Sequence, residues 1–394
     1  MHDDLDPLME KYGIDSLLVT GNAFENPSMF WLTGFRSPDE IIYLKNRGDE
    51  AIAASTFLAI ERVRKESFIT RTHDYTDVVL KILQENKVVG DNMDRVYSSL
   101  LKAEFSGKTL GVSDDFPASL LVMLQKMGYA VKVVRDLLLE ARSRKSSREI
   151  KTIKKAGDAT TSAILQVIEI VKSSTIGANG ILVYKGNPLT VGMIKLALEH
   201  FLLDKGAESS EDAIIAVGNK AFDWHYLGTT GDKLKAGVPI IMDVFPRLKL
   251  ERYIADVTRT VVRGSVPKRV QEMFTAVAAA ADASVDALTD GAIIDDVNLA
   301  CVNTLKRHGF DSRRLNPSAK DGMTHGLGHG IGLEVHELPS MYRREEPFLE
   351  GHIMAIEPGV YLKSIGGVRI ENDYAVTKGK AKRLTMGIDD ILFV

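Results

Sequence analysis

Short apolar runs alternate with helical patterns along the first third of the chain, up to about residue 135. Four runs rich in aliphatic and β-branched residues predict strands, because such residues suit the pleated surface of a sheet. They cover residues 15–20, 40–44, 109–112 and 131–134. Between the last two, apolar residues at helical spacing predict a helix over 117–127, which Gly128 would end. Alternating strands and helices indicate an α/β domain.

A polar, basic segment at residues 141–147 then interrupts the pattern and marks a junction. Ser146 and Glu149 have the spacing of a capping box, which predicts that a long helix starts here. Thr160 interrupts the apolar face of this helix. A second helix is predicted over 190–204, and β-rich sequence follows at 213–217, 240–245 and 253–262.

The same order of elements then recurs. Pro267 suits the first position of a helix, and another helix is predicted from about Asp295 to Gly309. β-rich sequence returns at 324–337, 354–361 and 367–372. The stretches from about 145 to 264 and from about 265 to 380 therefore look like two versions of one helix–helix–hairpin unit. We expect an α+β protein with two domains, residues 1–140 and 141–394.

One stretch of the second repeat, residues 324–337, contains three of the chain's nine histidines: His325, His329 and His336. Glycines lie among them at four alternate positions, from Gly326 to Gly332. Histidines four apart can share a helix face, but each interior glycine costs a helix about 1 kcal/mol relative to alanine. Extended backbone, or a loop that passes close to another group, is therefore predicted. The alternative is a glycine-rich surface loop whose histidines have no function.

Each half also carries one acid in each of two apolar strand sequences. Asp243 and Asp256 are thirteen residues apart in the first half, and Glu357 and Glu371 are fourteen apart in the second. If the strands fold as hairpins, each pair lies side by side across the ladder. One such acid alone would be read as a solvent-facing residue or half of a buried salt bridge. A buried carboxylate is costly unless it is paired or bound to a metal.

Four acids in matching places, together with a histidine, instead indicate divalent cations. Two ions bridged by carboxylates would neutralise the charge, and ions about 3.5–4 Å apart can generate and aim a hydroxide. Oxygen-rich ligation with one imidazole favours harder ions such as Mn²⁺ over a thiolate-type zinc site. Mn²⁺ or Co²⁺ is therefore expected, with Zn²⁺ or Fe²⁺ as alternatives.

Composition narrows the function classes. With 50 basic and 53 acidic residues the net charge is −3, which gives no reason to expect a nucleic-acid partner. The single cysteine, Cys301, lies in an apolar helical pattern and is predicted to be a small core residue. The acidic N-terminus lacks the plan of a signal peptide, and no apolar run reaches the roughly 18 residues of a membrane span. We expect a cytoplasmic protein that does not bind membranes.

The acids and histidines, in this order, resemble the pita-bread metallopeptidases, which include methionine aminopeptidase, aminopeptidase P and prolidase. The resemblance covers residues from about 145 to 394. Its motifs are Asp243, Asp256-Val-Thr-Arg-Thr, Gly-His329-Gly-Ile-Gly-Leu-Glu-Val-His-Glu, Glu357-Pro-Gly and Arg369-Ile-Glu. Residues 30–35, Phe-Trp-Leu-Thr-Gly-Phe, match a signature of the creatinase-type N-terminal domain found in the proline-directed members.

The resemblance implies both a fold and an activity. The fold would be a pita-bread domain, with two pseudo-repeated halves around a curved antiparallel sheet, preceded by a creatinase-like α/β domain. The activity would be hydrolysis of the bond between an N-terminal residue and proline in small peptides, by an Xaa-Pro aminopeptidase or an Xaa-Pro dipeptidase. A homodimer is also implied.

The resemblance further assigns a role to each candidate residue. Asp256 and Glu371 would bridge two ions, and the remaining ligands would be Asp243, His329 and Glu357. Glu357 could also shuttle the proton of the attacking water.

Four other residues would face the substrate. His225, in Phe-Asp-Trp-His-Tyr, and His336 match substrate-contacting histidines that could hydrogen-bond the scissile amide and the developing oxyanion. Taken alone, His225 would be read as a structural histidine. His325 and Arg369 match positions near the proline site.

One feature departs from the family pattern. The hairpin at residues 245–252 is two residues longer than usual and more basic, so the substrate preference near it stays open. The residues do not decide between a dipeptidase and an aminopeptidase. A metal-free C–N hydrolase of the creatinase type and a non-catalytic binding protein on the same fold are the alternatives. The complete ligand set counts against both.

Overall fold

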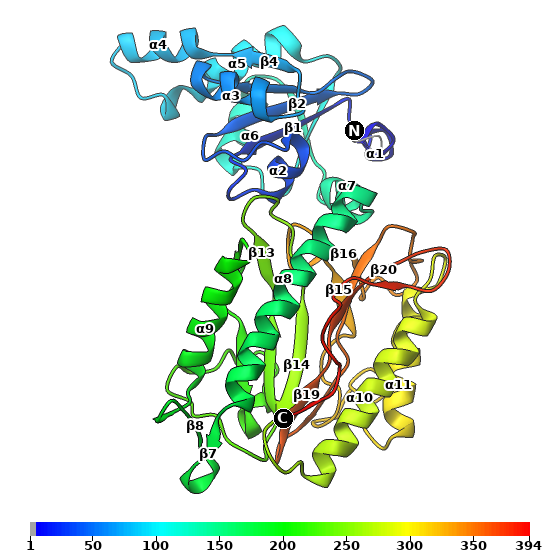
Figure 1. The fold of residues 1–394 in the computed structure, drawn as a ribbon. Helices are drawn as coiled ribbons and strands as arrows, with labels where there is room; N and C mark the ends of the chain where they lie inside the picture. The colour runs from blue at the N-terminus through cyan, green and yellow to red at the C-terminus, as the bar shows by residue number, and fades with distance from the viewer. Residues whose placement is uncertain (1–4) are drawn as a thin grey trace. The chain divides into compact units, whose positions relative to one another are not determined.

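A computed structural model describes residues 5–394 of the chain (Figure 1). The chain separates into two compact units. The first ends at Arg142, and the second runs from Ser143 to Val394.

The first unit is built on a six-stranded mixed sheet with the strand order β4-β3-β2-β1-β5-β6. β1 pairs in parallel with β5 and antiparallel with β2. The four predicted strands are confirmed as β1 (Ser16–Gly21), β2 (Ile41–Asn46), β5 (Thr109–Val112) and β6 (Ala130–Val133). Two strands were not predicted, β3 (Ile52–Ser55) and β4 (Arg71–Asp74). β4 has the sequence Arg-Thr-His-Asp, without an aliphatic residue, so it lacks the apolar run that marks the predicted strands.

Seven helices accompany this sheet in the described part of the chain. They are α1 (Leu5–Lys11), α2 (Pro27–Thr33), α3 (Phe57–Glu66), α4 (Thr76–Gln84), α5 (Met93–Glu104), α6 (Ala118–Lys126) and α7 (Leu137–Ser143), with a 3₁₀ turn η1 (Gly90–Asn92). The aromatic stretch at 30–35 ends α2, where Gly34 adopts a left-handed φ of 61°. Leu32 and Phe35 are buried in the core of the first unit.

The second unit repeats one arrangement of paired helices and strands. α8 (Ser147–Lys172) and α9 (Val191–Asp204) belong to the first half, and α10 (Lys268–Ala287) and α11 (Ile294–Arg307) belong to the second. In Figure 1 the two helix pairs flank the strands of this unit. The predicted capping box at Ser146 and Glu149 is present. Thr160 is tolerated on the buried face of α8 because its hydroxyl donates to the Ala156 carbonyl at 2.8 Å.

Each half has its own sheet and its own apolar core. The first sheet has the order β11 (Ile214–Val217), β12 (Ile240–Val244), β14 (Val257–Val262) and β22 (Leu392–Phe393). The second has the order β16 (Glu337–Ser340), β15 (Gly328–Gly330), β17 (Ile353–Ile356), β20 (Asn372–Ala375) and β21 (Lys382–Arg383). The hairpin of β18 (Gly359–Leu362) and β19 (Gly366–Arg369) continues from β17 and β20. Pairing is antiparallel except for β22, which runs parallel to β14. Cys301 is fully buried in the second core.

The remaining elements are short. They are β7 (Thr175–Ile176), β8 (Leu182–Tyr184), β9 (Asn187–Pro188), β10 (Ala207–Ser209), β13 (Pro246–Leu248) and the 3₁₀ segments η2 (Ala178–Gly180) and η3 (Gly218–Phe222).

The strand register corrects one expectation about the acids. Ile356 pairs with Asn372 and Gly359 with Arg369, so the register places Glu357 directly opposite Glu371, as predicted. Asp243, however, pairs with Thr258, which puts Asp256 on the diagonal rather than opposite.

The predicted strand at 253–262 was also too long at its start, because β14 begins only at Val257. Residues 253–256 turn their backbone toward the second half. The Ile254 N–H donates to the Gly332 carbonyl at 2.8 Å, and the Asp256 N–H donates to Asp373 Oδ2 at 2.9 Å. Asp256 is therefore held by a residue 117 positions away.

The long basic hairpin folds back as β13 against β10. There Glu208 forms ion pairs with Arg247 at 3.1 Å and with Lys249 and Arg252 at 3.6 Å each. One carboxylate thus faces three cations, and the hairpin keeps an excess of positive charge.

Candidate metal centre

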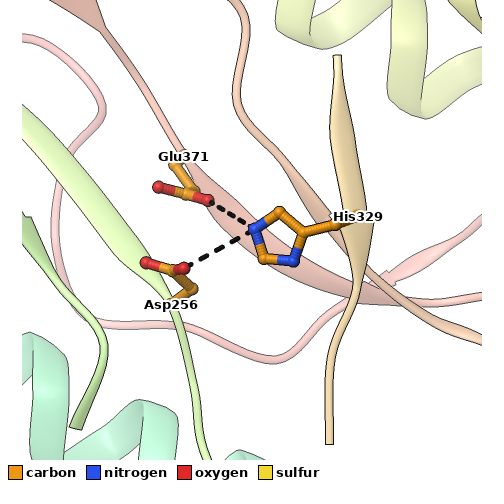
Figure 2. A group of neighbouring side chains, drawn as sticks. All are labelled: Asp256, His329 and Glu371. Atoms are coloured by element: carbon orange, nitrogen blue, oxygen red, sulfur yellow. Dashed lines mark ion pairs between the residues drawn. The ribbon is translucent and has the colours of Figure 1, made fainter. Parts of the chain in front are cut away.

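Three predicted ligands meet where the two halves of the second unit come together (Figure 2). Asp256 immediately precedes β14, His329 is the middle residue of β15, and Glu371 lies between β19 and β20. His329 Nε2 is 3.7 Å from Asp256 Oδ2 and 3.9 Å from Glu371 Oε1. One donor atom from each residue lies within 4.8 Å of the other two, which is close enough for a single cation to contact all three.

The glycines around His329 explain why the histidine can reach this place. A Cβ on Gly328 would lie 1.9 Å from the Ala355 carbonyl oxygen, and one on Gly330 would lie 2.5 Å from the Leu338 backbone. Only glycine lets β15 pack this closely against its neighbours β17 and β16. The prediction of extended backbone passing close to another group is confirmed.

His329 is prepared to act as a ligand. Its Nδ1 lies 3.2 Å from the Gly330 carbonyl, an acceptor, which places the ring proton on Nδ1 and leaves the Nε2 lone pair toward the carboxylates. Burial lowers the pKa of His329 to about 4, so the imidazole is neutral near pH 7. A neutral imidazole with a fixed tautomer is the form that binds metal ions.

Asp243 and Glu357 extend this group. Asp243, in β12, is buried, and its Oδ2 accepts a hydrogen bond from Arg369 Nη2. Glu357 follows β17, and its Oε2 lies 3.8 Å from His325 Nδ1. Both carboxylates are near enough to Asp256 for their charges to raise its pKa. The structure thus brings all five predicted ligands into one region, with Asp256, His329 and Glu371 at its centre.

The carboxylates lack the positive charge that their burial requires. Burial, together with neighbouring carboxylates, raises the pKa values of Asp256 and Glu371 well above their usual range. Burial also raises the pKa of Glu357 to about 8, against the opposing charge of Arg369. Among residues 5–394, Asp243 Oδ1, Asp256 Oδ1 and Asp373 Oδ1 are buried without a hydrogen-bond partner. Divalent cations would satisfy the Asp243 and Asp256 oxygens and keep the acids ionised, so the donor set fits such ions.

These pKa shifts predict how the cation-free protein responds to pH. A carboxyl whose pKa is raised on folding stabilises the fold below its unfolded pKa, and this stability is lost as the pH rises through the folded pKa. For Glu357 the window runs from about 4.5 to about 8. The melting temperature of chelated protein should therefore fall between about pH 5 and pH 9, and added Mn²⁺ should oppose the fall most strongly at the alkaline end. Differential scanning calorimetry measures this, and a melting temperature that rises with pH after chelation would contradict it.

Three residues that support the acids were not predicted. The Thr258 hydroxyl donates to Glu371 Oε2 at 2.6 Å, Asp373 accepts the Asp256 N–H, and the buried Tyr361 hydroxyl accepts from Arg369 Nη1 at 2.8 Å. Thr258 lies inside a quoted motif, so its spacing from Asp256 was a usable signal. Asp373 and Tyr361 gave no signal of their own, because their roles depend on contacts between distant strands.

Arg369 is more deeply embedded than its expected place beside a substrate suggests. Its side chain is 2% exposed, and it donates to Asp243, to Thr258 Oγ1 at 3.1 Å and to the Tyr361 hydroxyl. Each nitrogen of the guanidinium therefore already has a partner within the protein.

The other predicted histidines surround the acid cluster. His325 Nε2 forms a hydrogen bond of 2.9 Å with the Tyr361 hydroxyl. Burial lowers the pKa of His325 to about 3. The ring of His336 lies 4.3 Å from that of His329, centroid to centroid. His225 follows η3, and its ring lies 3.6 Å from that of Trp224, centroid to centroid, in a tilted contact. His225 is exposed, as is His336. Two exposed imidazoles beside a buried acid cluster are suitably placed to meet a ligand from solvent.

Comparison with known proteins agrees with this geometry. The sequence profile of "Metallopeptidase family M24" matches residues 151–378, and that of the "Creatinase/Prolidase N-terminal domain" matches residues 2–143. The chain belongs to metallopeptidase family M24. The predicted resemblance and fold class are thereby confirmed, and the protein is a metallopeptidase with a creatinase-type N-terminal domain.

Individual relatives span almost the whole chain. An Xaa-Pro dipeptidase of Pyrococcus horikoshii is 28% identical over 382 residues, which are 96% of this chain and 94% of the relative. A crystal structure of the prolidase from Pyrococcus horikoshii OT3 superposes with a TM-score of 0.78 at 26% identity, covering 99% of each chain. An X-Pro aminopeptidase from Thermotoga maritima shares the fold, with a TM-score of 0.79 at 22% identity over 98% of this chain and 100% of that one.

Along residues 5–394, no helix combines the length and the apolar character needed to cross a bilayer.

Proposed function

We propose that this M24 family member is a dinuclear Xaa-Pro peptidase, which hydrolyses the bond between an N-terminal residue and proline. The observation that carries the proposal is the His329 imidazole, neutral and oriented by Gly330, facing the buried carboxylates of Asp256 and Glu371, of which Asp256 Oδ1 has no hydrogen-bond partner. The creatinase-type domain and the names of the relatives support the choice of substrate.

Asp243, Asp256, His329, Glu357 and Glu371 would hold two divalent ions, with Asp256 and Glu371 shared between them. When bound, such ions supply Lewis-acid polarisation of the scissile carbonyl and lower the pKa of water. Mn²⁺ or Co²⁺ is the proposed occupant, because oxygen donors dominate the site.

The remaining groups act through this chain's own atoms. Glu357, partly exposed at 20%, takes the proton of the attacking water and passes it to the leaving nitrogen. His225 and His336 hydrogen-bond the scissile amide and the developing oxyanion. His325 lies at the proline end of the substrate. Arg369, whose donors are engaged by the protein, orients Asp243 and Tyr361 beside it.

Peptide hydrolysis tests the proposal directly. With added Mn²⁺ or Co²⁺, the protein should cleave Xaa-Pro dipeptides, longer Xaa-Pro-Yaa peptides, or both, and should leave matched Xaa-Ala peptides largely intact. Cleavage of dipeptides alone identifies a dipeptidase, and cleavage of the longer set identifies an aminopeptidase. Absence of turnover on both sets, with metal bound, would count against the proposal. It would favour the non-catalytic alternative.

Replacing His336 by alanine separates substrate binding from metal binding. We expect His336→Ala to lower kcat about 10²- to 10³-fold, the usual effect of removing one oxyanion donor. Metal content should be unchanged, because His336 is outside the ligand set. Elemental analysis and steady-state rates on one preparation check both statements, and loss of metal in this variant would contradict the assigned role.

Two further expectations accompany the proposal. A homodimer and a cytoplasmic location stay predictions, and sedimentation analysis and cell fractionation test them.

A further inference from the structure

A buried ion pair includes Glu337, the residue that follows His336 in the chain. Lys145 Nζ lies 2.9 Å from Glu337 Oε2, and the two side chains are 1% and 2% exposed. The proposed reaction uses neither residue. A fully buried pair of this kind is expensive to desolvate, so it requires a reason beyond stability.

Glu337 closes this loop upon itself. Its Oε1 accepts the backbone N–H groups of Leu333 at 2.9 Å and Glu334 at 3.2 Å, while Oε2 accepts from Lys145. A Cβ on Gly332 would lie 2.5 Å from Oε2, so glycine is required there to make room for the carboxylate. The Glu337 carboxylate thus sets the path of residues 332–337, which we call the histidine loop.

Lys145 ties the histidine loop to a rigid element. It directly precedes Ser146, the N-cap of the 26-residue helix α8. Its own N–H donates to the Gly351 carbonyl at 2.8 Å, which fixes its backbone. The ammonium group therefore reaches the loop from a point that cannot easily move.

We propose that Lys145 and Glu337 are positioning residues that hold the His336 imidazole beside His329 through the histidine loop. His336 is exposed, so its place is set by the loop backbone rather than by enclosure. The inference rests on the proposed peptidase function, because it deepens the role given there to His336.

Kinetics of Lys145→Met, in two backgrounds, test the proposal. The substitution keeps most of the length of the side chain and removes its charge, so Glu337 loses its ion pair with Lys145. In the otherwise unchanged enzyme we expect kcat to fall about 10- to 100-fold with KM within about twofold, as for a misplaced catalytic group. In the His336→Ala background the same change should cost less than about threefold, because the group it positions is already absent. An equal loss in both backgrounds would overturn the proposal.

Hydrogen exchange tests the same idea without reference to activity. In Lys145→Met the Leu333 and Glu334 amides should exchange at least about tenfold faster, because their acceptor, the Glu337 carboxylate, loses its ion pair with Lys145. Unchanged exchange would overturn the inference even in an active enzyme. Faster exchange in a protein that cleaves no Xaa-Pro peptide would reject the proposed function. It would still support the conclusion that Lys145 and Glu337 hold the histidine loop in place.

Two further variants complete the test, one as a substitute for Lys145→Met and one as a control. If Lys145→Met does not fold, Glu337→Gln, which removes the negative charge that pairs with Lys145, is carried through the same kinetics and exchange with the same expected outcomes. Lys154→Met is the matched control, because Lys154 lies on α8 in an exposed pair with Asp158 at 2.8 Å. It should change neither kcat nor exchange in the histidine loop. Similar effects in the control would overturn the proposal.

Discussion

Glu357→Gln should abolish peptide hydrolysis and leave the fold nearly unchanged. Without cations, burial raises the pKa of Glu357 to about 8, so near neutrality the folded protein already carries a protonated, uncharged side chain there. Glutamine imitates that form in size and charge. It cannot accept or release a proton, and loss of an acid–base group typically costs about 10²- to 10⁴-fold in rate.

The measurement combines circular dichroism, thermal melting, metal content and turnover of an Xaa-Pro peptide on one preparation. Glu345→Gln is the control. Glu345 is exposed and lies in the same half of the second unit, so this variant should retain full activity. A Glu357→Gln enzyme with normal kcat would refute the role assigned to Glu357. Normal melting and normal metal content with lost activity would locate the effect in the chemistry.

Removal of divalent cations should have an equally large effect. After exhaustive chelation we expect residual activity below about one part in 10³, because the polarisation that the ions supply has no substitute among the surrounding side chains. The chelated protein should also melt at a lower temperature, since an ion at about a thousand times its Kd stabilises the fold by about 4 kcal/mol.

Adding single metal ions back to the chelated protein shows which ion supports the activity. Mn²⁺ or Co²⁺ should recover the activity, whereas Mg²⁺, which prefers a more hydrated octahedral site, should recover little. Full activity in protein shown by elemental analysis to be free of metal would favour the creatinase-type, metal-free alternative.

Much of the site was accessible from the sequence because its signals are local. The capping box at Ser146 and Glu149 starts α8, and the glycines beside His329 indicate close backbone approach. The two acid pairs at nearly equal spacing were enough to suggest hairpins in two related halves. Each of these features lies within a stretch of fifteen residues.

The rest depends on contacts that no local pattern records. Asp256 is fixed by Asp373 and Lys145 reaches Glu337, across 117 and 192 residues respectively. The register that sets Asp243 against Thr258 follows from pairing of whole strands. Such long-range pairings are chosen by the assembled core, so a single sequence gives no spacing from which to infer them.

The charge of the 245–252 hairpin illustrates the same limit. Its cations suggested a possible influence on substrate choice. In the fold, Arg247, Lys249 and Arg252 gather around Glu208 on β10, a strand whose pairing with β13 was not predicted. Any effect on substrates therefore depends on the net charge of this group and stays a prediction.

The most direct test of the account is a crystal structure of Mn²⁺-loaded protein with anomalous diffraction data. Two anomalous peaks should lie among Asp243, Asp256, His329, Glu357 and Glu371, with the carboxylates of Asp256 and Glu371 touching both. Fully loaded crystals in which no peak lies among these side chains would contradict the account.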